Sequence, residues 1–517
     1  MNNVSELIKQ MLQPTFYPHP TVENIDLVQT HASYVFLTGE YAYKVKKEVD
    51  FGFLDYSTLA KRKHFLDREL ELNREVAPEL YIEVIAIARC NGELVLGDAN
   101  KIVEYTLKMR QFPQENLFSN LLQTGELDSE CIKKLGKIVA EFHQQAKTSD
   151  YISSFGTVAK IKAAFDENYR QSQKYIGVVQ TQEQYAETKT YSDRIFTERQ
   201  DLFEQRVTEQ KIKECHGDLH LNNICWWQDK ILLFDRIEFN ESFRFVDTMY
   251  DVAFVMMDLE AKHRVDLANV FLNSYLEQTG DWSGLLILPL YLSRQAYVRA
   301  KVNSFLLDDT QVSEADKRQA QKTARDYYRQ AYQYTQIDSG SILIMSGLSG
   351  SGKSTVAQEI ARNLGAIQIR SDAVRKHIAG ITLDKTREDI YTPEMTQKTY
   401  NRLMELGIML SKEGYKVILD AKYDRLNLRQ AIAEQAKANS IPLRIIHCTA
   451  PISVLRDRLN QRQNDVSDAT ANLLQNQQAN AEDFTSAEQN IVTTIDTSQT
   501  NWRERNLAQQ LLDIEDV

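Results

Sequence analysis

The chain has 517 residues, of which 43% are hydrophobic and 26% are charged, and its formal net charge is −11. This length predicts two or three domains, and the acidic balance argues against broad, backbone-driven binding to nucleic acid. No apolar run reaches the length of a membrane span, residues 1–20 carry no cleavage signature, and the 5 cysteines form no CxxC pair. We therefore expect a cytoplasmic protein without a membrane segment.

The sequence pattern in the first two thirds of the chain indicates a strand-rich beginning and a mainly helical remainder. "SYVFLTGEYAYKVKK" is two β-rich runs around a turn at Gly39 and Glu40, which indicates a hairpin. Residues 59–76 carry apolar side chains at helical spacing. Further strands are expected at residues 80–87, 92–97, 101–112, 223–227 and 230–235. Helices are expected from residue 127 to about 213, and again after residue 235 to about 334.

The pattern changes at Asp338–Gly340, "DSG", where we place a domain boundary. Strand-like segments ("SILIMSG", "AIQIRSD", "KVILDA", "LRIIHCTA", "NIVTTIDTS") then alternate with segments of helical length. This alternation predicts a doubly wound parallel sheet, hence an α/β domain. The expected domains are residues 1–337 and 338–517.

"GLSGSGKST" fits the phosphate-binding pattern G-x-x-x-x-G-K-[ST], with a strand before it and a helix after it. Glycines allow backbone N–H groups to surround phosphate oxygens, the lysine reaches the β and γ phosphates, and the serine hydroxyl binds Mg²⁺. A glycine-rich linker that matches by chance is the alternative. The expected nucleotide ligands are Gly347, Gly350, Ser351, Gly352, Lys353, Ser354 and Thr355.

Charged residues follow the later strands of this domain. Asp372 is placed to accept a proton from a substrate hydroxyl, with cations at Arg375 and Lys376 for an anionic substrate. Asp420 ends a strand where an acid supports Mg²⁺. Helix caps and solvated charges are the alternatives. Arg458 and Arg462, one helical turn apart, would close over the transferring phosphoryl group, unless the helix is merely charged and exposed.

Residues 340 to about 500 resemble the small P-loop kinases, a group with AAA-type ATP binding that includes gluconate and shikimate kinases, polynucleotide kinase and zeta toxins. The resemblance rests on the loop, on Asp372 with Arg375, and on the Arg458 and Arg462 pair. It implies phosphoryl transfer from ATP and does not choose the acceptor.

A second motif, "CHGDLHLNNI" at Cys215–Ile224, needs a separate explanation. Its two histidines with Asp218 suggest metal ligands, but no further His/Cys cluster completes such a site. The order Asp218, Asn223, then Asp235 after a strand matches the protein-kinase scheme of catalytic base, metal-binding Asn and metal-binding Asp. That scheme also needs an upstream Lys and Glu, for which we favour Lys44 and Glu69 over their neighbours Lys46 and Glu71. The literal "DFG" at 50–52 comes too early for the metal role, and its Phe51 with Phe53 and Leu54 is expected to pack.

Residues 25–330 resemble the aminoglycoside-phosphotransferase family, which implies an α+β, protein-kinase-like, bilobal fold. In that resemblance Asp218 is the base, Asn223 is a metal ligand and Asp235 holds the DFG-like position. No GxGxxG covers the nucleotide, so Lys44 is assigned by order. A group of acids follows Asp235 and could line a cationic pocket or, as we favour, cap and solvate helices: Glu238, Glu241, Asp247, Asp251, Asp258 and Glu260.

The sequence therefore predicts a two-domain, ATP- and Mg²⁺-dependent phosphotransferase with two separate sites, each acting on a hydroxyl of a small molecule. A zeta-toxin-like kinase restrained by the kinase-like domain and a 5′-hydroxyl nucleic-acid kinase remain alternatives, and an aminoglycoside-resistance role ranks below them. The acceptors and the oligomeric state are not determined by the sequence.

Overall fold

A computed structural model describes residues 3–310, 312–385, 387–461, 466, 474–499 and 502. Its contacts divide the chain into two compact units. The first unit is Met1–Asp128, Phe142–Glu167 and Asp193–Asp258, and the second is Ser129–Glu141, Asn168–Ser192 and Leu259–Val517. The domain boundary expected between residues 337 and 338 stays a prediction.

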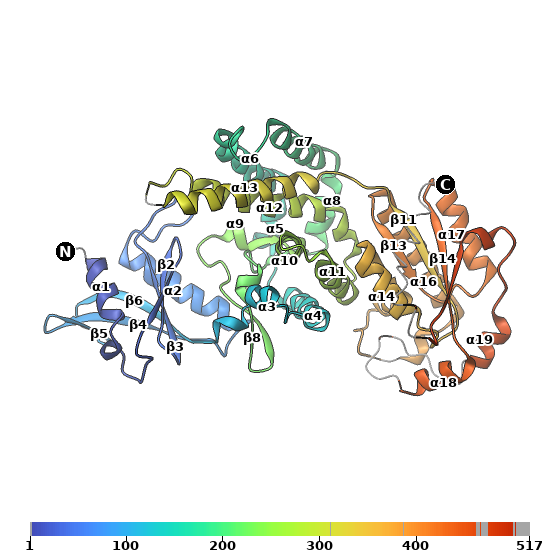
Figure 1. Ribbon diagram of the computed structural model, residues 1–517, viewed down its shortest axis with the longest axis horizontal. Helices are drawn as coiled ribbons and strands as arrows, with labels where there is room; N and C mark the ends of the chain where they lie inside the picture. The colour runs from blue at the N-terminus through green and yellow to red at the C-terminus, as the bar shows by residue number, and fades with distance from the viewer. Residues whose placement is uncertain are drawn as a thin grey trace. The chain divides into compact units, whose positions relative to one another are not determined.

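The first unit contains a six-stranded antiparallel sheet in the order β1-β2-β3-β6-β4-β5 (Figure 1). The expected hairpin joins β2 to β3, and Gly39 at its turn has φ +106°, a backbone conformation that suits glycine. Alternate residues such as Phe36, Tyr43 and Ile87 face a buried cluster. The strands are β1 (Asp26–Gln29), β2 (Ser33–Leu37), β3 (Tyr41–Lys46), β4 (Tyr81–Cys90), β5 (Glu93–Leu96) and β6 (Ile102–Arg110).

Helix α2 (Leu59–Arg74) packs on β4 and β6 through Leu66, which lies in one buried cluster with Leu80 and Leu107. Thr58 caps its first turn by accepting the Lys61 N–H. The helix presents Glu69, with no exposed surface, toward the strand that carries Lys44. The predicted helix at residues 59–76 is thus confirmed.

Short strands and helices complete the first unit. β7 (Ile212–Glu214) pairs with β10 (Phe245–Asp247), and β8 (Ile224–Trp227) pairs with β9 (Lys230–Leu233). The segment between β7 and β8 contains the "CHGDLHLNN" motif. Helices up to this point of the chain include α1 (Asn3–Met11), α3 (Phe118–Thr124), α4 (Ser129–Gln145), α5 (Asp150–Ser153), α6 (Val158–Ser172), α7 (Gln182–Glu198), α8 (Gln200–Thr208), α9 (Glu241–Arg244) and α10 (Thr248–Ala261), some of which extend into the second unit.

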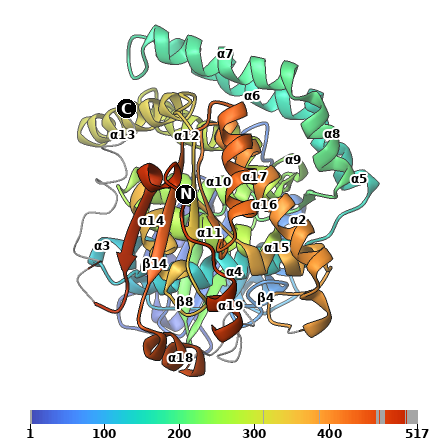
Figure 2. The same cartoon turned by 90° about the vertical axis from the view of Figure 1, so that its right-hand side faces the viewer.

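The second unit contains a five-stranded parallel sheet in the order β12-β13-β11-β14-β15. Helix α14 covers one face through Val356 and Ile360, and α16 lies on the other, where Gly407 adjoins Ile342 and Leu419. Figure 2 shows β14 with α14, α16 and α17. The elements are β11 (Ser341–Ser346), α14 (Lys353–Leu364), β12 (Ile367–Arg370), α15 (Ser371–Ile378), α16 (Pro393–Lys412), β13 (Lys416–Asp420), α17 (Leu426–Ala438), β14 (Leu443–Thr449), α18 (Ile452–Gln461), α19 (Leu474–Asn480) and β15 (Val492–Asp496).

Three further helices belong to the second unit: α11 (Val265–Thr279), α12 (Leu288–Phe305) and α13 (Glu314–Gln333). α12 and α13 pack together, with the Tyr297 and Tyr328 rings at 5.0 Å. Across the described ranges, no helix combines the length and the apolar character that crossing a membrane requires. The α+β and parallel α/β fold classes expected from the sequence are both confirmed.

Candidate active sites

Lys44, Glu69 and Asp235 meet in the first unit, although they are far apart in the sequence. Lys44 Nζ donates to Glu69 Oε1 at 2.7 Å and to Asp235 Oδ1 at 2.6 Å. Burial lowers the pKa of Lys44, but Asp235 and Glu69 outweigh this and hold the pKa well above its ordinary value. Lys44 is therefore a fixed cation, and the structure brings these three predicted residues together.

Lys46 makes a second, more deeply buried set of contacts on the same strand face. Its Nζ donates to Glu69 Oε2 at 2.8 Å and to Glu238 Oε1 at 2.5 Å, and Tyr56 also donates to Glu238. Burial raises the pKa of Glu69, and Lys44 with Lys46 overcomes this effect, so that the pKa lies below its usual value. Glu69 thus holds both lysines, and only Lys44 also contacts Asp235.

Asp218 and Asn223 lie on one tight loop. Asn223 Nδ2 donates to the Asp218 carbonyl at 2.9 Å and approaches Asp218 Oδ2 at 3.4 Å. Gly217 has φ +86°, and a Cβ there would lie 2.4 Å from the Phe243 carbonyl, so only glycine fits. The Asp218 side chain is 39% exposed, whereas Asn223 is buried. An exposed carboxylate on a rigid loop suits a base that must meet an incoming hydroxyl.

Two of the acids after Asp235, Asp251 and Asp258, hold the backbone of this loop. Asp251, fully buried, accepts the His216 N–H at 2.7 Å and the Gly217 N–H at 2.9 Å, and Asp258 accepts the Leu221 N–H at 3.0 Å. Asp247 accepts the Met249 N–H at the start of α10, as a helix cap does. The expectation that these acids solvate helices is therefore wrong for Asp251 and Asp258, and Glu238 is likewise buried against Lys46. Sequence spacing gave no signal for these long-range contacts.

His143, Cys215 and Asp251 form a buried group whose ligand atoms lie within 4.8 Å of one another. Both Asp251 oxygens already accept backbone N–H groups, and burial raises the pKa of the Cys215 thiol well above its usual value. His216 Nε2 bonds the Phe234 carbonyl at 2.9 Å, and burial lowers the pKa of His216 to about 4. His216 is thus neutral and held by the backbone, the Asp251 oxygens are already occupied, and a metal role for the loop is not supported.

The literal "DFG" segment lies outside the Lys44 cluster. Leu54 is buried, as expected, but Phe51 and Phe53 are 46% and 51% exposed. Both rings nevertheless pack, since Phe53 lies against Phe239 and Phe243 with ring centroids 6.3 and 6.1 Å apart, and Phe51 stacks on Phe53 at 6.0 Å.

The glycine-rich loop after β11 is closely fitted to its neighbours. Gly347 has φ +133°, and a Cβ there would lie 2.3 Å from the Cys448 carbonyl. Gly352, with φ +82°, precedes α14, so the helix begins at Lys353. Lys353 Nζ donates to the Gly347 and Leu348 carbonyls at 2.9 and 2.8 Å, and burial lowers its pKa. Gly350, Ser351, Ser354 and Thr355 complete the loop and the first helical turn.

Asp420 lies at the carboxyl end of β13, buried and next to the loop strand β11. Its Oδ2 accepts Gln368 Nε2 at 2.9 Å and lies 3.9 Å from Arg370 Nε. Asp372 lies in the first turn of α15, directly after β12. Sequence reasoning missed Gln368, because an amide in a buried strand carries no motif.

Two predicted cations near Asp372 are buried, so the alternative of solvated charge is wrong for them. Arg375 donates to Thr396 Oγ1 at 3.3 Å, and Lys376 donates to the Leu383 carbonyl at 2.9 Å. Arg375 Nε has no hydrogen-bond partner among the described residues. A buried donor of this kind is available to an anionic group.

Arg458 contacts the glycine-rich loop from α18. Its guanidinium donates to the Gly350 carbonyl at 3.3 Å and to the Thr497 carbonyl at 2.6 Å. Arg462 lies outside the described residues. The role of both arginines over a phosphoryl group stays a prediction.

A hollow of about 330 Å³ lies beside the loop. Ser351 Oγ, in a residue only 1% exposed, and the buried His447 Nδ1 line it, and neither atom has a hydrogen-bond partner among the described residues. Burial lowers the pKa of His447, which favours the neutral ring. His447 on β14 was not predicted as a site residue. A histidine near the end of a predicted strand, with no motif to explain it, is the signal that could have identified it.

Both sets of side chains fit a magnesium–nucleotide complex by their donor chemistry. Asn223 and Asp235 offer amide and carboxylate oxygens, and Ser354 and Asp420 offer a hydroxyl and a carboxylate, the hard ligands that Mg²⁺ prefers. Each set also includes a lysine ammonium for phosphate oxygens, Lys44 or Lys353.

Residues 342–484 match the family model of an AAA domain. An uncharacterized protein of Mycobacterium tuberculosis is 27% identical over 462 residues, which cover 88% of this chain and 90% of that relative. A sugar kinase from Janibacter is 23% identical and covers 34% of this chain and 95% of its own, with a TM-score of 0.27. Amicoumacin kinase in complex with AMP-PNP, Ca²⁺ and Ami is 14% identical and covers 64% and 94%, with a TM-score of 0.36. The AAA-type resemblance expected for the C-terminal part is confirmed.

Proposed function

We propose that the chain is an ATP-dependent phosphotransferase with two separate sites, each of which transfers the γ-phosphate of ATP to a hydroxyl of a small molecule. The observation that carries the proposal is that each predicted set of phosphate- and metal-binding residues lies within its own compact unit. Lys44, Glu69 and Asp235 form one set, and the Gly347–Thr355 loop with Asp420 forms the other.

At the first site, Glu69 orients the Lys44 ammonium toward the nucleotide phosphates. Asn223 and Asp235 bind Mg²⁺, which neutralises charge that develops on the phosphates. Asp218 accepts the proton of the substrate hydroxyl, and Asp251 holds the backbone of its loop in place. Because phosphoryl transfer depends mainly on positioning, this rigid support favours catalysis.

At the second site, the N–H groups of the loop and Lys353 hold the phosphates, with Ser354 and Asp420 as metal ligands. Lys353 would exchange its bonds to two loop carbonyls for bonds to phosphate. Asp372 is the proposed base. The hollow beside the loop offers hydrogen-bonding groups at Ser351 and His447, and Asp424, Glu482 and Asp483 also line it, so hydroxyls of an acceptor would find both donors and acceptors there.

The test is ATP turnover by the full chain across a library of small alcohols, sugars and amino alcohols. Asp218→Asn should lower turnover of one acceptor by about 10²–10⁴-fold. Lys353→Ala should abolish turnover of a second acceptor and leave the first unchanged.

An assay with oligonucleotide acceptors separates the nucleic-acid-kinase alternative from this proposal. Phosphate incorporation only into oligonucleotide 5′ ends, with no small acceptor found, would replace this proposal by a nucleic-acid kinase. If Asp218→Asn and Lys353→Ala both retained all ATP turnover, the proposal of two phosphotransferase sites would be refuted.

A further inference from the structure

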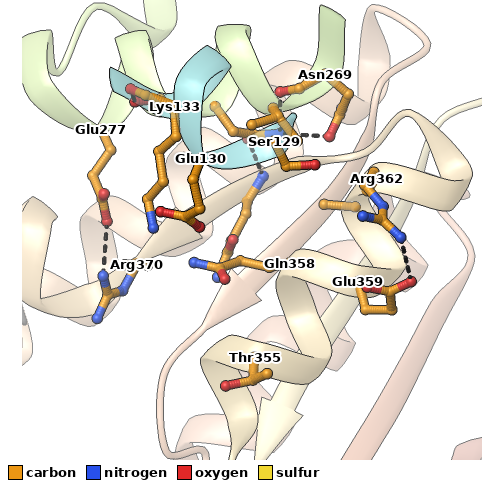
Figure 3. A pocket seen from close by; sticks show the side chains of 15 residues that line it. Ser129, Glu130, Lys133, Asn269, Glu277, Thr355, Gln358, Glu359, Arg362 and Arg370 are labelled. Carbon is orange, nitrogen blue, oxygen red and sulfur yellow. Dashed lines mark hydrogen bonds and ion pairs between the residues drawn. The ribbon is translucent and has the colours of Figure 1, made fainter. Parts of the chain in front are cut away.

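The outer edge of strand β12 is covered by helix α11 within the second unit. Among the residues that the structure describes, β12 is the edge strand of the parallel sheet, and no strand lies on one side of its backbone. An uncovered edge leaves N–H and C=O groups without partners. Figure 3 shows the polar hollow of about 280 Å³ beside this contact, lined by α4, α11, α14 and β12.

Two asparagines of α11 supply the missing partners. Asn269 Nδ2 and Asn273 Nδ2 donate to the Ala366 carbonyl at 2.9 and 3.0 Å. The Gln368 N–H donates to Asn273 Oδ1 at 2.7 Å. A side chain of α11 thus takes the place of a sixth strand at this point of the edge.

Gln368 carries this contact to Asp420. Its backbone is fixed by Asn273, and its side-chain Nε2 donates to Asp420 Oδ2 at 2.9 Å. A carboxylate with one oxygen held by an amide presents the other in a defined direction. Outer partners of this kind orient metal-ligating carboxylates.

Glu277, one turn further along α11, pairs with Arg370, the cation that lies near Asp420. Its Oε1 accepts a hydrogen bond from Arg370 Nη1 at 3.1 Å (Figure 3). Arg370 Nε lies 3.9 Å from Asp420 Oδ2. The Arg370 and Glu277 side chains are only 13% and 17% exposed, so solvent screens them weakly. Without Glu277, the guanidinium would pair with Asp420 and compete with a bound cation.

We propose that Asn273 and Glu277 are positioning residues of the P-loop magnesium site, an inference that rests on the proposed function. Asn273 fixes the Gln368 amide that orients Asp420, and Glu277 draws Arg370 away from that carboxylate. The metal affinity of the glycine-rich loop therefore depends on a helix that lies before residue 338 in the chain.

Binding of a fluorescent ATP analogue to the full chain tests the proposal without need of an acceptor. Lys44→Met with Asp235→Asn serves as the background, so that the signal reports the second site. Titrations are run with Mg²⁺ and with EDTA. Asn273→Ala and Glu277→Gln should each weaken Mg²⁺-dependent binding by about tenfold and leave binding in EDTA unchanged.

Matched controls come from the same hollow. Asn269→Ala loses a bond to Ala366 without touching Gln368, and Arg362→Ala breaks an ion pair with Glu359 that does not reach β12. Both should bind as the background does. A Mg²⁺ response in Asn273→Ala and Glu277→Gln equal to that of the controls would overturn the inference.

Two variants distinguish failure of this inference from failure of the proposed second site. Glu277→Gln retains an acceptor for Arg370, so it reports on charge even if Asn273→Ala fails to fold. Adding Lys353→Ala to the background should abolish the signal. A signal that survives this substitution would overturn the proposed second site itself, and the inference with it.

Discussion

Two lysines on one strand share Glu69, yet their surroundings assign them different roles. Lys44 also contacts Asp235 and is 12% exposed, whereas Lys46 is 1% exposed and binds Glu238. Lys44→Met should therefore weaken nucleotide binding at the first site by about 10- to 100-fold, the range of a charged hydrogen bond. Titration of an ATP analogue in a Lys353→Ala background measures this.

Lys46→Met is the matched control for Lys44→Met. It leaves the buried Glu238 carboxylate without its lysine partner, which should lower the free energy of unfolding by about 3 kcal/mol. Nucleotide affinity should change little. Urea unfolding measures the loss of unfolding free energy, and titration of the ATP analogue measures nucleotide affinity. Equal losses of nucleotide affinity in the two variants would contradict the division of roles.

His216 gives the fold a dependence on pH. Its pKa is about 4 in the folded chain, below the ordinary value of 6.5, because it is buried. The unfolded chain therefore binds the extra proton first, so the stability from neutral His216 is complete above pH 6.5 and is lost as pH falls toward 4. The slope should be about 1.4 kcal/mol per pH unit. His216→Gln should flatten the unfolding free energy measured between pH 7 and pH 5; an unchanged slope would exclude His216 as its source.

At the scale of elements, the glycine-rich loop tolerates no side chain at Gly347, where a Cβ would collide with the Cys448 carbonyl. Gly347→Ala should abolish nucleotide binding at the second site in the Lys44→Met, Asp235→Asn background. Gly365, at the other end of α14, also has a positive φ, but its Cβ would meet nothing within 4 Å. Gly365→Ala should cost only about 1 kcal/mol of stability and retain binding. Similar binding by the two variants would contradict this account.

Sequence reasoning located the elements that carry local signals. The hairpin before Lys44, the helix with Glu69 and the strand–loop–helix around Lys353 all have periodicity or turn residues that a single segment reveals. The contacts of Asp251, Gln368 and Asn273 could not be predicted in this way, because each joins segments distant in sequence and uses a residue type that is common on surfaces.

At the scale of the whole molecule, the break in sequence pattern at 338 does not coincide with the grouping of contacts, since residues 259–337 belong to the second unit. A fragment of residues 338–517 would expose the edge of β12. We expect it to self-associate more than the full chain in sedimentation velocity, because bare strand edges pair. Gln368→Pro, which removes the outward N–H, should reduce this association; a monomeric parent fragment would contradict the prediction.

The asparagine-covered edge of β12 also limits how such chains can be recombined. A chimera joined at residue 338 would place a foreign strand against Asn269 and Asn273, whose amides match only a backbone with the same spacing of carbonyl and N–H. A crossover point ahead of α11 would transfer the helix together with the strand it covers, and so would keep this match intact.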